Sequence, residues 1–196
     1  MSPRSKEQVE EIRESRRQQI MDAALHLFAN EGYAHCTISN LAEHAGISKG
    51  LMYNYFSSKQ ELLESIIQQG LNELLNLFDP NRDGILTSGE FVEFIRKLFS
   101  IMRGNKEFWV LYVSILMQPG VKEHLNERSI PGYREFIRIL MDYLTRKGFE
   151  DPELEALTLS AMIEGLGVLM VYAHPVMDIP DELLHKYENR IIDMYK

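Results

Sequence analysis

The chain has 196 residues, 45% of them hydrophobic, and a formal net charge of −8, which suits one large or two small domains with a sizeable core. The acidic balance excludes a protein that coats nucleic acid through overall basicity, so any DNA contact must come from a local patch. The single cysteine excludes a disulfide framework, and the sequence lacks an apolar run long enough to cross a bilayer, so we expect a cytoplasmic protein without membrane contact.

The first expected helix covers residues 15–30. Residues 1–14 are polar and charged, which favours a frayed arm or an extension of this helix. Basic residues here either contact phosphates or belong to a solvated face; they are Arg4, Lys6, Arg13, Arg16 and Arg17. The apolar residues of the helix form one broad stripe, and Gly32 ends it. The stripe consists of Ile20, Ala23, Ala24, Leu25, Leu27 and Phe28.

Residues 37–59 predict two short helices joined by a tight turn, followed by the start of a longer helix. In the turn, Gly46 can adopt the left-handed conformation that stops a helix, and Ser48 can cap the next one. That next helix, from Lys49 to about Phe56, buries Leu51, Met52 and Phe56 at best. Its outward face then carries Lys49, Gly50, Tyr53, Asn54 and Tyr55. A short helix with exposed polar residues behind such a turn is typical of a major-groove reader and predicts DNA binding.

A longer pattern surrounds these helices: F-x-x-x-G-Y, then T-I-x-x-L-A-x-x-A-G-I-S-K-G-x-x-Y-x-Y-F-x-S-K-x-x-L, from Phe28 to Leu62. This pattern resembles the DNA-binding domain of the TetR family of bacterial repressors. The resemblance implies an all-α fold of about nine helices of ordinary length. It implies a DNA-binding domain over residues 1–58 and a regulatory and dimerisation domain over residues 59–196. It also implies a homodimer that reads a palindromic operator in double-stranded DNA.

The resemblance assigns DNA contacts to matching positions of this chain. The expected phosphate contacts are Thr37, Tyr53, Tyr55 and Lys59. The opening of the reading helix, where the family approaches base edges and backbone, is Ser48, Lys49 and Gly50. The expected sequence readers are Leu51 and Asn54, at positions that vary among family members. Alternatively the aromatic run only packs the small domain, which we favour for Phe56, whereas Tyr53 and Tyr55 can do both.

Residues 79–90, DPNRDGILTSGE, match the calcium loop of an EF-hand. Side-chain oxygens at alternating positions converge on one point, and Gly84 makes the sharp turn at the sixth position. The expected ligands are the side chains of Asp79, Asn81, Asp83, Thr87 and Glu90 and the backbone carbonyl of Ile85. Hard oxygen ligands of this kind favour Ca²⁺ over zinc or copper.

The same loop has a plainer interpretation. Asp-Pro-Asn-Arg-Asp-Gly also ends a helix, and Thr87 to Glu90 form a capping box for the next one. Because the loop follows the fourth helix, which joins head to body in the resembled family, bound calcium would re-angle that helix and change operator affinity. The sequence contains no second loop of this kind for Leu86 to pair with.

The rest of the body predicts a core, an organic-ligand pocket, or both. The candidate pocket residues are Phe94, Phe99, Met102, Phe108, Trp109, Tyr112 and Met162. Aromatic and methionine stripes at helical spacing also occur in ordinary cores. Helices over residues 153–174 and 181–195 resemble the family's dimer-forming pair, with an intramolecular helix hairpin as the alternative. We expect chain breaks near Gly104, Pro119, Pro131 and Gly148.

Three functions follow from these patterns. The first is a TetR-like repressor switched by calcium. The second is a TetR-like repressor released by an apolar small molecule, with calcium structural or absent. The third, a calcium-binding interaction protein without DNA, fits the density of the reading-head pattern poorly. We do not expect an enzyme, because the sequence shows no nucleophile–base arrangement and no phosphate-cradling glycine loop.

Overall fold

A computed structural model describes residues 6–104, 113–115, 117–118, 121, 130–172 and 179–196, and these residues form helices joined by turns and loops, with no strand among them. The helices are α1 (Lys6–Glu31), α2 (Ile38–His44), α3 (Lys49–Tyr53), α4 (Lys59–Phe78), α5 (Ser88–Gly104), α8 (Ile130–Arg146), α9 (Pro152–Tyr172) and α10 (Asp181–Tyr195). The predicted all-α fold is therefore confirmed. None of the helices in the described part is long and apolar enough to span a bilayer.

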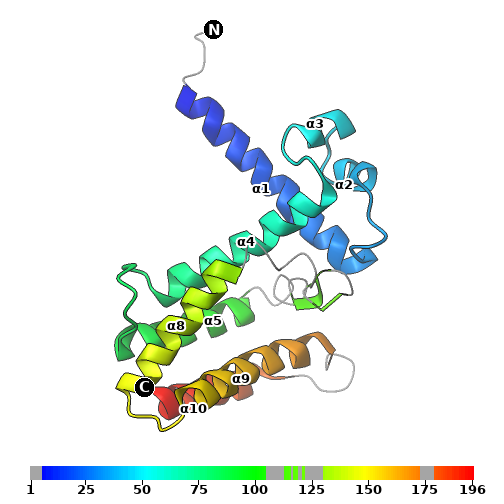
Figure 1. Ribbon diagram of the computed structural model, residues 1–196. Helices are drawn as coiled ribbons and strands as arrows, with labels where there is room; N and C mark the ends of the chain where they lie inside the picture. The colour runs from blue at the N-terminus through cyan, green and yellow to red at the C-terminus, as the bar shows by residue number, and fades with distance from the viewer. Residues whose placement is uncertain (1–5, 105–112, 116, 119–120, 122–129, 173–178) are drawn as a thin grey trace.

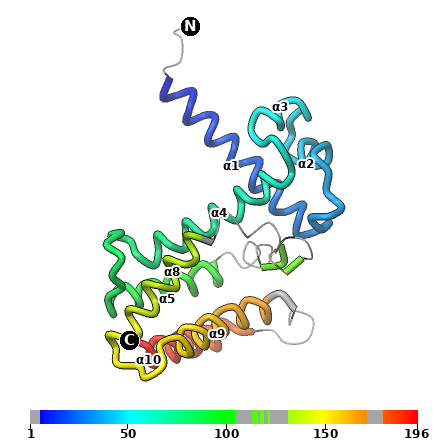
Figure 2. Tube along the Cα trace, in the orientation of Figure 1, coloured from blue at the N-terminus to red at the C-terminus, as the bar shows by residue number. Residues whose placement is uncertain are grey.

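Helices α1, α2 and α3 form a small head, and α4 runs from this head into a larger helical body (Figure 1). In the body, α5 packs against α10 and α8 packs against α9, while α4 contacts both α5 and α8. Helices α9 and α10 lie side by side at the end of the molecule farthest from the head, as the Cα trace also shows (Figure 2).

Head and body have separate hydrophobic cores that share one helix. The head core holds Phe28, Leu41, Met52 and Phe56 together with residues of the first half of α4, from Leu62 to Ile67. The body core includes Phe78 at the end of α4 and residues of α5, α8, α9 and α10. Because α4 is buried in one core at its start and in the other at its end, a tilt of α4 moves head and body relative to each other.

One of the two alternatives for the N-terminal arm holds, and two expected boundaries differ from the structure. Helix α1 begins at Lys6, so residues 6–14 extend the first helix as one alternative expected, and Val9 and Ile12 on it are exposed. Helix α3 ends at Tyr53 instead of near Phe56, because Asn54 follows it as the cap and Phe56 turns into the head core. The break expected at Pro131 is wrong: Pro131 lies in the first turn of α8, where a missing backbone N–H disrupts no helical hydrogen bond.

Candidate functional site

The turn between α2 and α3 is built from local hydrogen bonds. Thr37 caps α2 by accepting the N–H of Asn40 at 3.2 Å, and Ser48 caps α3 by accepting the N–H of Leu51 at 3.1 Å. Between them Gly46 has a φ of +65°, the left-handed conformation that its place in the sequence predicts. The Ile47 N–H then reaches back to the carbonyl of Ala42 at 2.9 Å. These contacts fix how α3 leaves α2.

Helix α3 buries one side and exposes the other. Met52 is fully buried and Phe56, just beyond the helix, is 1% exposed, so these two residues anchor the helix in the head core. Tyr53 is 49% exposed and Leu51 is 38% exposed, so the burial expected for Leu51 is wrong, while a base-contacting role needs this exposure. Further exposed residues around the helix are Thr37, Ser48, Lys49, Gly50 and Asn54. These residues form the exposed surface around α3, which a helix that enters a DNA groove requires.

Tyr55 and Lys59, the other two expected phosphate contacts, are half-buried. The Lys59 ammonium donates to the backbone carbonyls of Tyr33 at 2.7 Å and Cys36 at 2.8 Å, and it lies 4.3 Å from the centre of the Tyr33 ring. In this position Lys59 holds the corner between α1 and α2 closed. Its predicted phosphate contact stays a prediction, with these carbonyls as its partners in the absence of DNA.

Two further residues that brace the head were not singled out as such by the sequence. The Arg17 guanidinium donates to Ser65 on α4 at 2.9 Å and stacks on the Phe56 ring at 4.8 Å, so it ties α1 to α4 and covers the end of α3. Gln118, from the body, bonds backbone groups at the end of α1. Sequence patterns do not predict such contacts well, because the contacts of Arg17 and of Gln118 both join residues far apart in the chain.

Cys36 is a buried thiol in the head. Its Sγ lies 3.7 Å from the carbonyl oxygen of Leu27, and burial, with a contribution from Glu31, raises the pKa of this thiol above its usual value. A protonated, buried thiol reacts slowly with oxidants and electrophiles. This environment favours a packing role for Cys36 over a redox sensor.

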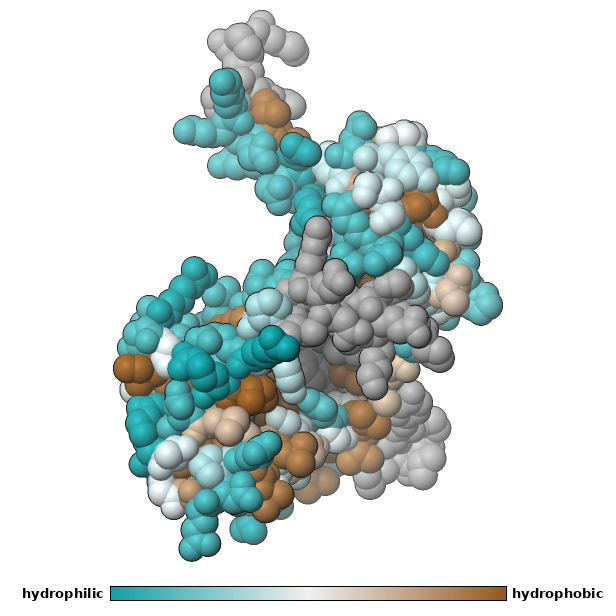
Figure 3. Space-filling model, viewed as in Figure 1, coloured by the Kyte–Doolittle hydropathy of each residue, from teal (hydrophilic) through white to brown (hydrophobic). Residues whose placement is uncertain are grey.

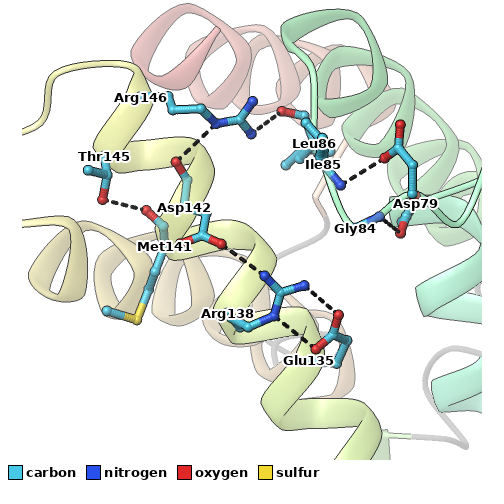
Figure 4. A network of polar contacts seen from close by, with 11 residues as sticks. Asp79, Gly84, Ile85, Leu86, Glu135, Arg138, Met141, Asp142, Thr145 and Arg146 are labelled. Atoms are coloured by element: carbon cyan, nitrogen blue, oxygen red, sulfur yellow. Dashed lines mark hydrogen bonds and ion pairs between the residues drawn. The ribbon is translucent and has the colours of Figure 1, made fainter.

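The loop over residues 79–90 connects α4 to α5 and packs against α8 (Figure 4). Asp79 Oδ2 accepts the N–H of Gly84 at 3.0 Å, and Asp83 Oδ1 accepts the N–H of Ile85 at 2.8 Å. Gly84 has a φ of +73°, as the predicted sharp turn requires. Leu86 is 1% exposed in the body core, and its carbonyl accepts a hydrogen bond from Arg146 of α8 at 2.8 Å.

The acidic side chains of this loop have unequal environments. Glu90 accepts the N–H of Thr87 at 2.8 Å while Thr87 Oγ1 accepts the N–H of Glu90 at 3.2 Å, which is the capping box of the plainer interpretation. Asp79 Oδ1 is buried and has no hydrogen-bond partner within the described part of the chain. In that same part, no three His, Cys, Asp or Glu side chains converge as a metal-holding group. Calcium binding therefore stays a prediction.

The candidate pocket residues in the described body are packed in its core. Phe94, Phe99 and Met102 of α5 are at most 2% exposed, and Met162 of α9 is half-buried against the same core. The other three candidates, Phe108, Trp109 and Tyr112, lie outside the described residues. The described side chains that would line an apolar pocket therefore belong to one hydrophobic core of the body.

Helices α9 and α10 also carry large apolar residues on their outer surfaces. Leu157 is 66% exposed, Leu154 is 55% exposed and Leu169 is 47% exposed, all on α9. Leu183 and Met194 of α10 are exposed as well. Figure 3 shows apolar surface on the lower part of the molecule, which α9 and α10 form. Exposed apolar residues grouped on one helix pair favour contact with another protein surface.

Comparison with known proteins agrees with this geometry. Residues 20–66 match the model of the family described as bacterial regulatory proteins, tetR family. A curated relative, the fatty acid metabolism regulator protein of Bacillus subtilis, is 25% identical over 140 residues, which are 70% of each chain. The regulator BetI of Paraburkholderia phytofirmans is 40% identical over 63 residues, 32% of each chain.

The fold extends this similarity to the body. The fatty acid degradation regulator FadR from Bacillus halodurans superposes with a TM-score of 0.71 at 18% identity, over 90% of this chain and 94% of that one. FadR from Bacillus subtilis, solved in complex with stearoyl-CoA, superposes with a TM-score of 0.70 at 21% identity, over 91% and 96% of the two chains. Residues 20–66 of the head thus match the tetR family of bacterial regulatory proteins, and the chain has a TetR-like fold.

Proposed function

We propose that this chain is a dimeric repressor that binds a palindromic operator and is released by an apolar ligand held in its body. The observation that carries the operator-binding role is the exposed face of α3, where Lys49, Leu51, Tyr53 and Asn54 project while Met52 anchors the helix. A bacterial regulator of this kind works in the cytoplasm, where its DNA is.

The predicted DNA contacts divide by chemistry. Lys49, Tyr53, Tyr55, Lys59 and the Thr37 cap supply charges and hydroxyls that suit phosphates, which position the head without reading sequence. Asn54 supplies an amide that can pair with adenine, and Leu51 an apolar surface for a thymine methyl group. In a dimer, the two α3 helices would read half-sites about one helical turn, roughly 34–36 Å, apart.

In vitro selection from a random duplex library tests the operator-binding role. We expect the wild-type chain to enrich a palindromic sequence, and Asn54→Ala to lose preference at one position of each half-site by about 1–3 kcal/mol. Asn72→Ala, on the exposed surface of α4, is the matched control and keeps the wild-type preference. Failure of the wild-type chain to enrich any sequence would contradict the proposal.

The ligand class follows from the body and its relatives. FadR of Bacillus subtilis, solved with stearoyl-CoA, shares the fold over nine-tenths of this chain, and a curated relative is named the fatty acid metabolism regulator protein. The described candidate pocket residues, Phe94, Phe99, Met102 and Met162, offer the apolar and pliable lining that a long acyl chain needs. We therefore propose a long-chain acyl compound as the releasing ligand, with stearoyl-CoA as the probe to test.

The dimer belongs to the same proposal. Leu154, Leu157 and Leu169 on α9, together with exposed residues of α10, supply a self-complementary apolar surface at the end opposite the head. A two-fold interface there would leave both α3 faces free and fix their separation. A ligand that changes the body between interface and head would then change that separation.

A second candidate, calcium modulation at residues 79–90, is favoured by one observation. Asp79 Oδ1 is buried without a hydrogen-bond partner in the described residues, beside backbone that already makes the turn a calcium loop needs. A buried carboxylate oxygen without a partner is costly, and a bound cation would offset that cost. Glu90 would have to exchange its contact with Thr87 for the ion, which would couple calcium to the start of α5.

Calorimetric titration of metal-stripped protein with calcium tests this second candidate. We expect binding of about one ion per chain in the 10⁻⁶ to 10⁻³ M range, lost in Glu90→Gln and kept in Glu93→Gln on the exposed side of α5. Magnesium serves as the ionic control. Absence of heat up to millimolar calcium would leave residues 79–90 as a helix-capping loop.

A further inference from the structure

Gln118 lies in the chain between α5 and α8, two helices of the body, and its side chain contacts the head. Its Oε1 accepts the backbone N–H of Tyr33 at 2.6 Å, and its Nε2 donates to the backbone carbonyl of Phe28 at 2.9 Å. These partners are 85 and 90 residues away in the chain. Both ends of the amide are therefore used, which defines the orientation of the group.

The two bonded groups mark the point where α1 stops. Gly32, with a φ of +84°, turns the chain out of the helix, and its N–H donates to the same Phe28 carbonyl at 3.0 Å. The N–H of Tyr33 comes directly after this turn, and its acceptor is Gln118 Oε1. Gln118 thus completes the cap of α1 with a side chain from another part of the molecule.

The capped corner leads directly to the reading helix. The Tyr33 ring packs edge-on against Phe28 with ring centres 5.3 Å apart, and Lys59 holds the carbonyls of Tyr33 and Cys36. Thr37, the cap of α2, follows Cys36 in the chain, and α2 sets the direction of α3. A shift of the Gly32–Cys36 corner would therefore move α3.

Neighbours of Gln118 are embedded in the head as well. Ile115 is 1% exposed and Val121 is fully buried, and both belong to the head core that contains Phe28 and Leu41. Two apolar side chains and one bidentate amide therefore attach this body segment to the head. This attachment is separate from α4, which links the two parts along the chain.

We propose that Gln118 is a positioning residue through which the body sets the orientation of α2 and α3, and so the affinity for the operator. The inference rests on the proposed operator-binding function. A change in the body that withdraws Ile115, Gln118 and Val121 from the head breaks the Gln118 bonds, loosens the corner after α1 and lowers operator affinity. Gln118 itself does not contact DNA in this mechanism.

The test uses Gln118→Met, which keeps the length of the side chain and removes both hydrogen bonds, in the full-length protein. We expect operator affinity for the selected duplex to fall about tenfold, within the usual range of coupling between sites. Backbone amides of residues 32–54 should exchange with deuterium faster, while those of α9 and α10 keep the wild-type rate. Gln68→Ala, which removes an amide bonded to Asn72 within α4, is the control and leaves both readouts unchanged.

The outcomes separate this inference from the proposed function. Operator affinity within twofold of wild type in Gln118→Met would overturn the inference while leaving the repressor intact. If the wild-type chain enriches no duplex, the proposed function fails, and amide exchange tests the positioning of α2 and α3 by Gln118 alone. Equal exchange rates over residues 32–54 in wild type and Gln118→Met would then overturn that positioning role, and faster rates in the variant would uphold it. Should Gln118→Met fail to fold, Gln118→Glu replaces it, since it retains the acceptor for Tyr33 and loses the donor to Phe28.

Discussion

At the scale of single residues, the head divides its side chains between anchoring and contact. Met52 and Phe56 are buried and hold α3, whereas Lys49, Tyr53 and Asn54 stay exposed beside them. Lys59 and Arg17 are charged, but their contacts lie inside the head: Lys59 donates to backbone carbonyls, and Arg17 stacks on an aromatic ring. Lys59 is therefore both a brace of the head and a proposed phosphate contact, whereas Arg17 is a brace alone.

Lys49 gives the most direct residue-scale prediction. If its ammonium neutralises one phosphate, Lys49→Ala reduces the slope of log affinity against log salt by about 0.9 per half-site. The loss should be similar for matched and mismatched operators, because a phosphate contact carries no sequence information. Titrations at several salt concentrations measure it. Lys97→Ala, on an exposed lysine of α5 that pairs with Glu93, should keep the wild-type slope; an unchanged slope in Lys49→Ala would remove Lys49 from the DNA face.

Residue-scale prediction from sequence succeeded where the signals were local. Thr37, Gly46 and Ser48 form the caps and the turn that their types and spacing predict, because each acts on backbone a few residues away. Gln118 could not be found in this way. Its partners lie far along the chain, and a single glutamine between Met117 and Pro119 has no pattern that distinguishes a cap from a solvated side chain.

At the scale of elements, polar contacts of α10 join it to α5, α8 and α9. Tyr195 at the end of α10 donates its hydroxyl to Glu155 of α9 at 3.0 Å, and its carbonyl accepts the Tyr143 hydroxyl of α8 at 2.7 Å. Arg103 of α5 and the buried Glu188 of α10 form an ion pair at 2.7 Å. These contacts join α5, α8, α9 and α10 into one unit that can transmit a change at any of them.

Tyr195 predicts how the body responds to alkaline pH. Burial, together with the hydrogen bond and negative charge of Glu155, raises the pKa of Tyr195 to about 12. An unfolded tyrosine ionises near pH 10, so the unfolded chain loses this proton first. The stability that Tyr195 contributes is therefore fully present below about pH 10, and it is lost as the pH rises toward 12.

The variant Tyr195→Phe should flatten this dependence, because the group that ionises is gone. Urea unfolding at a series of pH values from about 8 to 11 measures the slope, with Tyr53→Phe on the exposed face of α3 as the control. A wild-type slope in Tyr195→Phe would mean that another group governs the alkaline loss of stability. Tyr143, whose pKa burial also raises, is the next residue to test.

Element boundaries show which sequence signals were reliable. Helix α10 spans Asp181–Tyr195, as expected after Pro180, and α4 begins at Lys59 behind its Ser58 cap. The end of α3 was set too late because Tyr55 and Phe56 continue an apolar pattern, yet tertiary packing draws Phe56 into the core after the helix has ended. The loop over residues 79–90 makes both the turn expected of a calcium loop and the capping box of its alternative. Its sequence therefore does not separate the two.

At the scale of the whole molecule, the proposed function needs two chains. The head presents one α3, and a palindrome has two half-sites. The apolar outer surface of α9 and α10 lies at the opposite end from the head (Figure 1), so a dimer formed there keeps both reading helices accessible. In the described part of the chain, helix α4 and the Gln118 hydrogen bonds link the body to the head that would bind the DNA.

Leu157 is the residue to change in this surface. It is 66% exposed in the single chain, and Leu157→Glu would place an unpaired charge in a buried interface, which costs several kcal/mol. Sedimentation equilibrium should show the dimer dissociation constant rising at least about a hundredfold, a factor that corresponds to roughly 3 kcal/mol. Val9→Glu, on the start of α1 where Val9 is 52% exposed, should dimerise as the wild type does. A Leu157→Glu chain that stays dimeric would move the interface elsewhere.

The central claim is that an apolar ligand in the body lowers operator affinity, and one titration tests it most directly. A labelled duplex carrying the selected operator is titrated with the protein in the presence of stearoyl-CoA, and in parallel with coenzyme A alone, while fluorescence anisotropy reports binding. We predict that stearoyl-CoA raises the operator dissociation constant about tenfold or more and that coenzyme A leaves it unchanged. An operator affinity that is the same with and without stearoyl-CoA would contradict the claim.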